Sequence, residues 1–205
     1  MSSYDYIVVG AGSAGCVLAS RLTEDPACRV LLLEAGGEDD SRLIRTPGFF
    51  AALQDTAVDW GYRTSPQAPL GGRRIFSPRG KVLGGTSSLN YMMFVRGNSR
   101  DYDNWRDLGN PGWGYSDVLP YFRRLEDCQD IEDEWHGRGG PVHVTRDPEP
   151  HPIVELYLEA AQAAGLPFNP DFNGKNQVGC GIYQRTIFNG RRWSAADAYL
   201  RPALN

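Results

Sequence analysis

Three glycines near the start of the chain, Gly10, Gly12 and Gly15, have the Gly-x-Gly-x-x-Gly spacing of a dinucleotide-binding turn. In such a turn the first glycine permits the tight bend and the second lets the backbone approach a pyrophosphate. The third lets a helix pack closely on a strand. Glu34 follows 19 residues after Gly15, where a carboxylate can accept hydrogen bonds from ribose hydroxyls. A 2′-phosphate would meet a like charge there, so the pattern favours NAD or FAD over NADP.

The residues around this turn predict the elements that it needs. Residues 4–9 and 29–33 are typical of two buried parallel strands, and residues 13–24 predict a helix between them. The predicted fold class is therefore α/β, with a Rossmann-like strand–helix–strand unit. The alternative is a glycine-rich turn that only closes this unit. A doubly wound sheet needs more strands, so either later segments complete it unusually or the chain is the amino-terminal part of a longer protein.

Composition argues against two classes of protein. The net charge is −4, with both signs scattered along the chain, so no basic surface for nucleic acid is predicted. No stretch approaches the roughly 18 consecutive apolar residues of a membrane span. The first predicted strand begins within a few residues of Met1, which leaves no room for a signal peptide. We therefore expect a cytoplasmic protein.

The cysteines and histidines form no metal or redox motif. The four cysteines contain no Cys-x-x-Cys pair, so Cys16 and Cys28 are expected to be small buried fillers. His136, His143 and His151 lack the spacing of metal ligands, and we predict no metal site. We assign none of the three a catalytic role, and His136 is expected to stabilise a turn.

A second glycine-rich segment covers residues 79–90, with the sequence Arg-Gly-Lys-Val-Leu-Gly-Gly-Thr-Ser-Ser-Leu-Asn. Its glycines and hydroxyl residues predict a loop whose backbone N–H groups can face a ligand. FAD is long enough to need such a cover over its pyrophosphate and isoalloxazine ring, whereas a nicotinamide enzyme would not need it. From composition alone, the alternative is a flexible surface loop.

This segment resembles the first signature of the glucose-methanol-choline (GMC) oxidoreductases, most closely their branch of choline-dehydrogenase-like alcohol dehydrogenases. The matching positions are Gly80, Lys81, Gly84, Gly85, Thr86, Ser87, Leu89, Asn90, Phe94, Gly97 and Asp103. Residues 60–62, 72–74, 171–174 and 192–194 add to the likeness. The resemblance covers essentially the whole chain, but only the amino-terminal part of a usual family member.

The resemblance implies an FAD-binding domain interleaved with a substrate-binding domain. It implies that the ADP half of FAD is held by Gly10, Gly12, Ser13, Ala14, Gly15 and Glu34. The pyrophosphate and flavin half would lie along Val82, Gly85, Thr86, Asn90, Tyr91, Met92 and Met93. Some members attach FAD through a histidine where this chain has Leu89, so a non-covalent flavin is implied. Tyr91 matches a position near the substrate path of an aryl-alcohol-oxidising relative, with packing under the flavin as its alternative role.

The implied reaction is oxidation of a small-molecule alcohol by hydride transfer to flavin N5, with a quinone-like compound or oxygen as electron acceptor. The family's catalytic base is a histidine near the far carboxyl end, so no catalytic residue is implied within these 205 residues. Loss of a positioned base lowers such a rate by roughly 100- to 10,000-fold. The chain alone is therefore expected to be inactive.

We expect residues 1–115 to form the FAD-binding domain and residues 116–205 to begin the substrate-binding region. Residues 35–115 are rich in glycine, proline and aromatics, which predicts a loop-heavy stretch. Beyond them, the predicted elements are a helix capped by Ser116, a strand over residues 140–145, a helix over 152–164 and a helix from Ser194 to Leu200.

Two other classes of function stay open at this point. One is a non-catalytic nucleotide-binding remnant, or a split subunit that needs a partner chain, because an incomplete sheet leaves an open edge. The other is an NAD-dependent dehydrogenase, which fits the first glycine pattern but leaves the second glycine-rich segment without a role.

Overall fold

The computed structural model describes residues 3–146 and 149–204, and the chain divides into two compact units. Unit 1 consists of Met1–Met92 together with Ile187–Asn205, and unit 2 is Met93–Thr186. Unit 2 is therefore an insertion in the sequence of unit 1. The expected boundary after residue 115 separates FAD-binding from substrate-binding residues and stays a prediction, whereas the compact units change over after residues 92 and 186.

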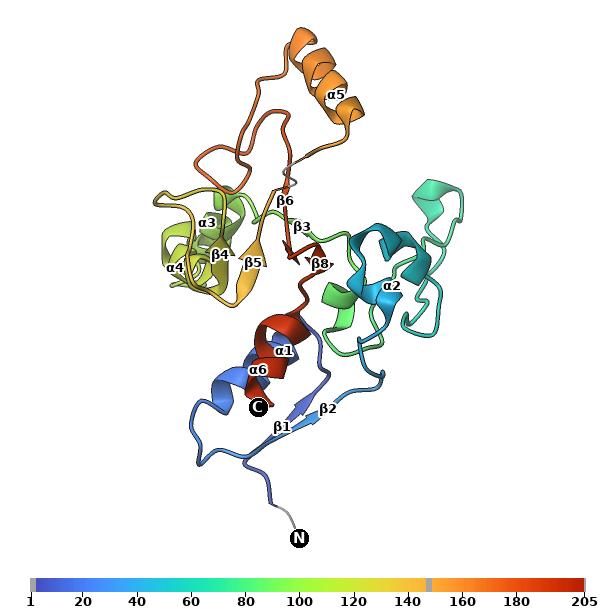
Figure 1. Ribbon diagram of the computed structural model, residues 1–205, viewed down its shortest axis with the longest axis vertical. Coiled ribbons are helices and arrows are strands. Elements are labelled where there is room, and N and C mark those ends of the chain that lie inside the picture. Colours follow the sequence, from blue (N-terminus) through green and yellow to red (C-terminus); the bar gives the residue numbers. More distant parts are fainter. Residues whose placement is uncertain (1–2, 147–148, 205) are drawn as a thin grey trace. The chain divides into compact units, whose positions relative to one another are not determined.

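Unit 1 begins with the predicted strand–helix–strand unit. β1 (Tyr6–Val9) pairs with β2 (Val30–Leu33) in parallel, and α1 (Ser13–Leu22) connects the two strands (Figure 1). The register places Tyr6 opposite Val30 and Val9 opposite Leu33. This arrangement confirms the α/β class and its Rossmann-like start, and in the described residues the sheet has these two strands.

The apolar side chains of β1 are largely uncovered in the described part of the chain. Tyr6, Ile7 and Val9 are 51%, 62% and 82% exposed. Strands of parallel sheets are normally covered on both faces, which is why their sequences are apolar throughout. The sequence of β1 thus fits a buried strand better than its surroundings here do.

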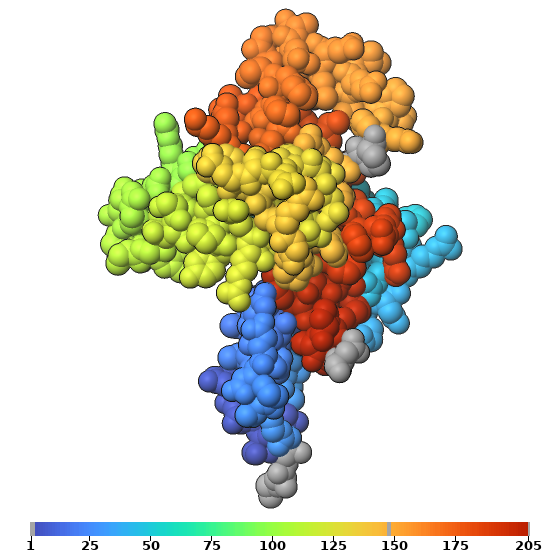
Figure 2. Space-filling model, turned by 60° about the vertical axis from the view of Figure 1, so that its left-hand side comes forward, coloured from blue at the N-terminus to red at the C-terminus, as the bar shows by residue number. Residues whose placement is uncertain are grey.

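The remaining elements of unit 1 are short, and in the sequence they precede or follow the insertion. They are α2 (Arg42–Arg45), η1 (Pro47–Leu53), η2 (Ala68–Leu70), η3 (Gly85–Ser88), β7 (Ile187–Phe188), β8 (Arg191–Arg192), η4 (Ala196–Leu200) and α6 (Arg201–Ala203). A small apolar core joins α2, η1 and the second glycine-rich segment, formed by Ile44, Leu53, Val82 and Leu89. The closing segment returns to the start of the chain, since η4 and α6 pack against α1 (Figure 2).

A network of buried charges fixes the closing segment within unit 1. Arg45 pairs with Asp197 and with Asp39 (3.4 Å), and Arg201 pairs with Asp39 and with Asp197 (2.8 Å). The hydroxyl of Ser194 also donates to Asp197 (2.8 Å). Burial alone would raise the pKa of Asp197, but hydrogen bonds from Ser194 and Arg45 outweigh it and lower the pKa. The network therefore connects the segment after β2 to the end of the chain.

Among its described residues, unit 2 has two pairs of short strands and three helices. Its elements are β3 (Met93–Phe94), α3 (Ser99–Asp107), α4 (Tyr115–Leu125), β4 (Glu126–Cys128), β5 (Val142–Val144), α5 (Pro152–Ala163) and β6 (Gln184–Arg185). β3 pairs antiparallel with β6, and β4 pairs parallel with β5. The predicted strand at 140–145 and helix at 152–164 correspond to β5 and α5. None of the helices in the described residues has the length and apolar character needed to cross a membrane.

Two predictions about helices need correction. α3 lies inside the stretch expected to be loop, where the Asn98 side chain accepts from the backbone of Arg100 and Asp101 accepts from the backbone of Asn98. The helix predicted to be capped by Ser116 begins earlier, with Gly114 as its N-cap. The helix predicted from Ser194 is present over Ala196–Leu200, with π-helical hydrogen bonding, and the Ser194 hydroxyl accepts from the N–H of Asp197 (3.3 Å) at its start.

We expect Asp197→Asn to lower the free energy of unfolding by about 3–5 kcal/mol, because removing one partner of a buried ion pair leaves uncompensated charge. Chemical denaturation at neutral pH measures this loss. Asp40→Asn, at an exposed aspartate, is the control and should change stability by less than about 0.5 kcal/mol. Since the folded pKa of Asp197 is lowered, its contribution is present above the ordinary aspartate pKa and is lost as pH falls through the folded value. Equal losses in both variants would contradict the network.

Candidate functional site

The turn between β1 and α1 depends on two of its glycines for its shape. Gly10 has a φ of +94°, which side-chain-bearing residues rarely adopt, and its N–H donates to the carbonyl of Leu33 (2.7 Å). A β-carbon on Gly15 would lie 1.8 Å from the carbonyl oxygen of Gly10. The helix therefore approaches the strand at a distance that only glycine permits, as the spacing predicted.

Gly12 has neither constraint, because its φ is ordinary, unlike that of Gly10, and nothing lies within 4 Å of its absent β-carbon, unlike that of Gly15. It is the N-cap of α1, with an ordinary φ of −73°. The first N–H groups of a helix have no partner within the helix and favour an anion. The packing of the protein does not require glycine at this position, whereas a ligand against the helix terminus would.

The second glycine-rich segment packs directly on this turn. Gly84 donates its N–H to the carbonyl of Ala11 (2.8 Å), and a β-carbon on Gly85 would lie 2.7 Å from the Cα of Gly12. A β-carbon on Gly36 would lie 2.1 Å from the Lys81 backbone, so the chain after β2 also touches this segment. The two glycine-rich segments of the sequence thus form one site.

Glu34 lies at the end of β2 and is fixed by the backbone. One carboxylate oxygen accepts from the N–H of Ala11 (2.7 Å), and the other accepts from the N–H of Gly36 (2.8 Å). A carboxylate has about four acceptor positions, so these two bonds leave capacity for two hydroxyl donors. The side chain is half-buried, in reach of solvent or a ligand.

A cavity of about 720 Å³ lies over the turn, within the volume range of small-molecule sites. It is lined by Val9, Gly10, Gly12, Ser13, Leu33, Glu34, Ala35, Trp60, Arg79, Gly80, Gly85 and Thr86. The structure thus brings together six predicted site residues. Six others, among them Trp60 and Arg79, were not predicted as site residues.

A buried aspartate positions the two large residues of this second group. Asp59 accepts hydrogen bonds from the N–H groups of Asp55, Gly61 and Arg79, between 2.9 and 3.1 Å. Burial would raise the pKa of Asp59, but these three bonds lower it. Trp60 follows Asp59 directly and donates its N–H to the carbonyl of Arg79 (2.9 Å). The hydrogen bond between Arg79 and Asp59 joins residues 20 positions apart, so no short sequence motif predicts it.

The other predicted site residues are not among those that line the cavity. Ala14 and Gly15 lie in α1, and Val82 is fully buried in the apolar core. Asn90 and Met92 form a turn in which Met92 has a φ of +59° and donates its N–H to the Asn90 side chain (3.0 Å). Their role along a flavin stays a prediction, as does that of Met93, which is exposed.

Tyr91 is held from one side only. Its hydroxyl accepts a hydrogen bond from the Gln54 side chain (2.9 Å), and its ring packs edge-on against Phe50 at a centroid distance of 4.5 Å. The side chain is nevertheless 49% exposed. About half of the side chain is therefore accessible to a ligand.

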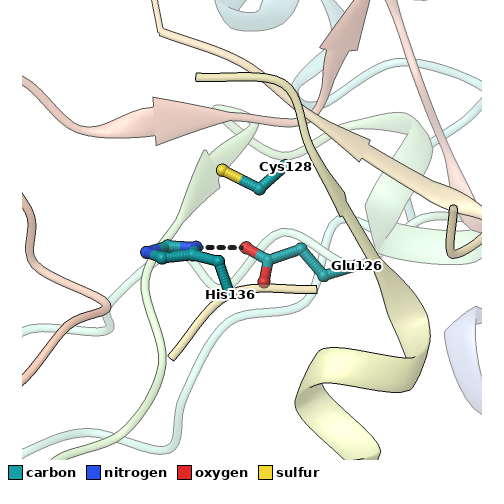
Figure 3. A group of neighbouring side chains, drawn as sticks. All are labelled: Glu126, Cys128 and His136. Atoms are coloured by element: carbon teal, nitrogen blue, oxygen red, sulfur yellow. Dashed lines mark hydrogen bonds and ion pairs between the residues drawn. The ribbon is translucent and has the colours of Figure 1, made fainter. Parts of the chain in front are cut away.

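His136 belongs to a buried ion cluster in unit 2. The alternation of β4 places Glu126 and Cys128 on the same buried side, next to the His136 ring (Figure 3). Nδ1 of His136 contacts Glu126 (3.1 Å), and Nε2 contacts Asp171 (3.1 Å). Burial would lower the pKa of His136, but hydrogen bonds to Asp171, Cys128 and Glu126 raise it to about 11. The imidazole is therefore a cation between two carboxylates.

This cluster fits a metal ion poorly, although the ligand atoms of Glu126, Cys128 and His136 lie within 4.8 Å of one another. Metal binding requires a neutral imidazole with a free nitrogen, whereas both ring nitrogens of His136 contact carboxylates. The guanidinium of Arg96 also pairs with Glu126 (2.6 Å). We therefore describe it as a structural ion cluster, a larger role than the turn expected for His136, whose N–H does contact Asp133 (3.0 Å).

The other histidines and Cys16 have local structural roles. Nδ1 of His143 contacts Asp127 (2.7 Å), and Nδ1 of His151 accepts from the N–H of Ile153 at the start of α5 (3.2 Å). Cys16 is fully buried, and burial raises the pKa of its thiol to about 11, so it stays protonated. This confirms Cys16 as a small filler, while Cys28 is only half-buried. All four cysteines are free thiols.

Comparison with known proteins gives consistent matches over the whole chain. A family model described as GMC oxidoreductase matches residues 4–205. The oxygen-dependent choline dehydrogenase of Sinorhizobium fredii is 48% identical over 201 residues, which are 98% of this chain and 37% of that protein. Pyridoxine 4-oxidase from Mesorbium loti superposes with a TM-score of 0.91 at 40% identity, covering 97% of this chain and 39% of that one.

An FAD-dependent oxidoreductase from Chaetomium thermophilum superposes with a TM-score of 0.89 at 33% identity. It covers 97% of this chain and 36% of its own. The present chain thus spans between 36% and 39% of the length of these three proteins.

Substitutions at Gly12 and Gly15 should differ in their cost to the stability of the ligand-free protein. Gly15→Ala places a β-carbon against the Gly10 carbonyl and should lower the free energy of unfolding by about 1–3 kcal/mol, as overpacking does. Gly12→Ala meets open space and should cost less than about 1 kcal/mol, the effect of alanine at an N-cap. Urea denaturation measures both. A cost for Gly12→Ala as large as that for Gly15→Ala would show that Gly12 serves packing instead.

The charge of His136 should make the free energy of unfolding depend on pH. Because its folded pKa is raised, the stabilisation is complete below the ordinary histidine pKa near 6.5 and is lost as pH rises toward about 11. The difference in free energy of unfolding between wild type and His136→Asn should shrink by about 1.4 kcal/mol per pH unit in this window. Urea denaturation at several pH values tests this. A difference that does not change with pH would mean that His136 is neutral in the folded chain.

Proposed function

The chain belongs to the GMC oxidoreductase family, and from this membership we propose that it supplies the FAD-binding part of an enzyme that oxidises an alcohol. The observation that carries the proposal is the cavity over the β1–α1 turn, where both glycine-rich segments meet. Bound FAD supplies the chemistry, because its flavin accepts a hydride. The residues of this chain bind and orient that group.

The residues over the turn fit the ADP half of FAD. Gly12 leaves space for a diphosphate at the N-terminus of α1, where the unpartnered N–H groups and helix dipole favour negative charge. Glu34 keeps two acceptor positions for the ribose hydroxyls, and its charge opposes a 2′-phosphate. Arg79 adds a positive side chain to the lining. Gly85 and Thr86 would cover the pyrophosphate from the second segment.

The flavin is proposed to be non-covalent. Leu89, the residue at the position where some family members carry an attaching histidine, has no nucleophilic atom. It is 4% exposed and packs with Ile44, Leu53 and Val82 in the apolar core. No side chain at this position can therefore form a bond to FAD.

The proposed substrate is an alcohol with a CH–OH group. Choline and pyridoxine, the compounds in the names of two relatives, are both alcohols. Tyr91, whose side chain is about half exposed, is the candidate contact for such a substrate. Oxygen is supported as electron acceptor by the words "oxygen-dependent" in the name of one relative, and a quinone-like acceptor is the other option.

We assign no catalytic base to this chain. The three histidines contact carboxylates or cap a helix in unit 2, and none of them lines the cavity over the turn within the described residues. Deprotonation of the alcohol therefore rests on a residue outside this chain, in keeping with the 37% of a full relative that the chain spans.

The purified holoprotein should show the flavin absorption band near 450 nm, a wavelength that is approximate and set by the flavin. Addition of an oxidisable alcohol without oxygen should bleach this band only in a protein that also supplies the catalytic base, and should leave the band of the 205-residue chain unchanged. Gly12→Ala should weaken FAD binding by about 10-fold or more, because its methyl group occupies the space against the diphosphate. Gly48→Ala, with nothing within 4 Å of the new methyl, is the control and should bind FAD normally. Absence of flavin from the wild-type protein, even after incubation with FAD, would overturn the proposal.

A further inference from the structure

Arg192 of β8 is a buried arginine that the proposed function does not use. It is 1% exposed, and in the described residues its guanidinium donates to backbone carbonyls and one side-chain amide. Nε donates to the carbonyl of Ile44 (2.9 Å). Nη1 donates to the carbonyls of Ser87 (3.1 Å) and Asn90 (2.8 Å) and to the Asn90 side-chain oxygen (3.0 Å). One guanidinium thus contacts α2 and both ends of the Ser87–Asn90 segment.

These bonds hold a turn that is strained. The Asn90 side-chain oxygen accepts both from Arg192 and from the N–H of Met92, whose φ is +59°. A positive φ at a residue with a side chain costs roughly 1–3 kcal/mol and persists only where the surroundings enforce it. Arg192 is the group that fixes the Asn90 amide in the orientation that Met92 requires. The turn would otherwise relax.

Arg192 forms no direct ion pair in the described residues. Its Nη2 has no hydrogen-bond partner there, and its other donors bind no carboxylate. Arg45, Arg96 and Arg201 each pair with a carboxylate. Burial lowers the pKa of Arg192 to about 10 against the opposing charge of Asp197, so it is still charged at neutral pH. A buried cation that forms no direct ion pair is costly.

We propose that Arg192 is a positioning residue for FAD, which holds the Ser87–Met92 turn in the conformation that receives the flavin half. The inference rests on the proposed function, because the family resemblance places Asn90 and Met92 along the flavin. Arg192 does this from behind the turn, being buried, through the carbonyls of Ser87 and Asn90. Arginine binds the carbonyl of Ile44 through Nε and the turn through Nη1 at the same time, and the single ammonium of lysine cannot supply both donor atoms.

The test compares Arg192→Lys and Arg192→Met with Arg201→Lys as a control in the same unit. Arg201 pairs with Asp39 and Asp197, so its substitution perturbs a charge network without touching Ser87 or Asn90. Amide hydrogen exchange of residues 87–92 is measured in the FAD-free protein, and FAD affinity by titration. The visible circular dichroism of bound FAD is recorded at saturation for each variant that still binds it.

Both Arg192 variants should accelerate exchange in residues 87–92 and weaken FAD binding by roughly 10- to 100-fold, the factor for losing one charge-assisted hydrogen bond. The lysine variant should also change the circular dichroism of bound FAD, whereas Arg201→Lys should leave all three readouts unchanged at equal thermal stability. Arg192 variants that change only the unfolding temperature would overturn the inference. If the wild-type protein binds no FAD while the Arg192 variants still accelerate exchange, the proposed function is refuted and the role of Arg192 in the turn is kept.

Discussion

Contact between backbones without intervening side chains is the constraint on which this molecule depends. The β1–α1 turn, the chain after β2 and the second glycine-rich segment meet where a β-carbon on Gly15, Gly36 or Gly85 would lie within 2.7 Å of a neighbouring atom. The same closeness assembles the cavity, since Gly12 and Gly85 both line it. Close contact between backbones therefore serves both the fold and the binding site. Gly12 is the exception, because the space beside it is open and packing does not require a glycine there.

The second determinant is the way charge is distributed around these contacts. The Asp39–Arg45–Asp197–Arg201 network balances its charges internally and joins distant segments of unit 1. Arg192 instead donates to the carbonyls of Ser87 and Asn90, at the end of the second glycine-rich segment. In unit 2, the cation between Glu126 and Asp171 is the imidazole of His136, whose two ring nitrogens contact the two carboxylates. Paired charges thus hold the framework. Arg192, which forms no direct ion pair in the described residues, instead holds the turn proposed to lie along the flavin.

Local patterns allowed part of this structure to be predicted. The apolar runs and glycines of residues 4–34 specify β1, α1 and β2 through nearest neighbours, and Glu34 follows from its place at the end of a strand. α3 was missed because its sequence is short and mostly polar, with only Tyr102 and Trp105 as large apolar side chains, although Asn98 and Asp101 carry the spacing of a capping box. Trp60, Gly36 and the His136 cluster depend on contacts between residues far apart in sequence. No short pattern encodes such contacts.

The insertion of unit 2 also has a consequence for how the polypeptide folds during synthesis. Met93 pairs with Arg185 and Phe94 with Gln184, so β3 and β6 close the insertion at its own two ends. A closed insertion returns the emerging chain to the point at which it left unit 1, which shortens the loop that η4 must close against α1 and lowers its entropic cost. Order of completion is thereby set by connectivity: the last helical turns of unit 1 can dock only after the intervening module has been translated.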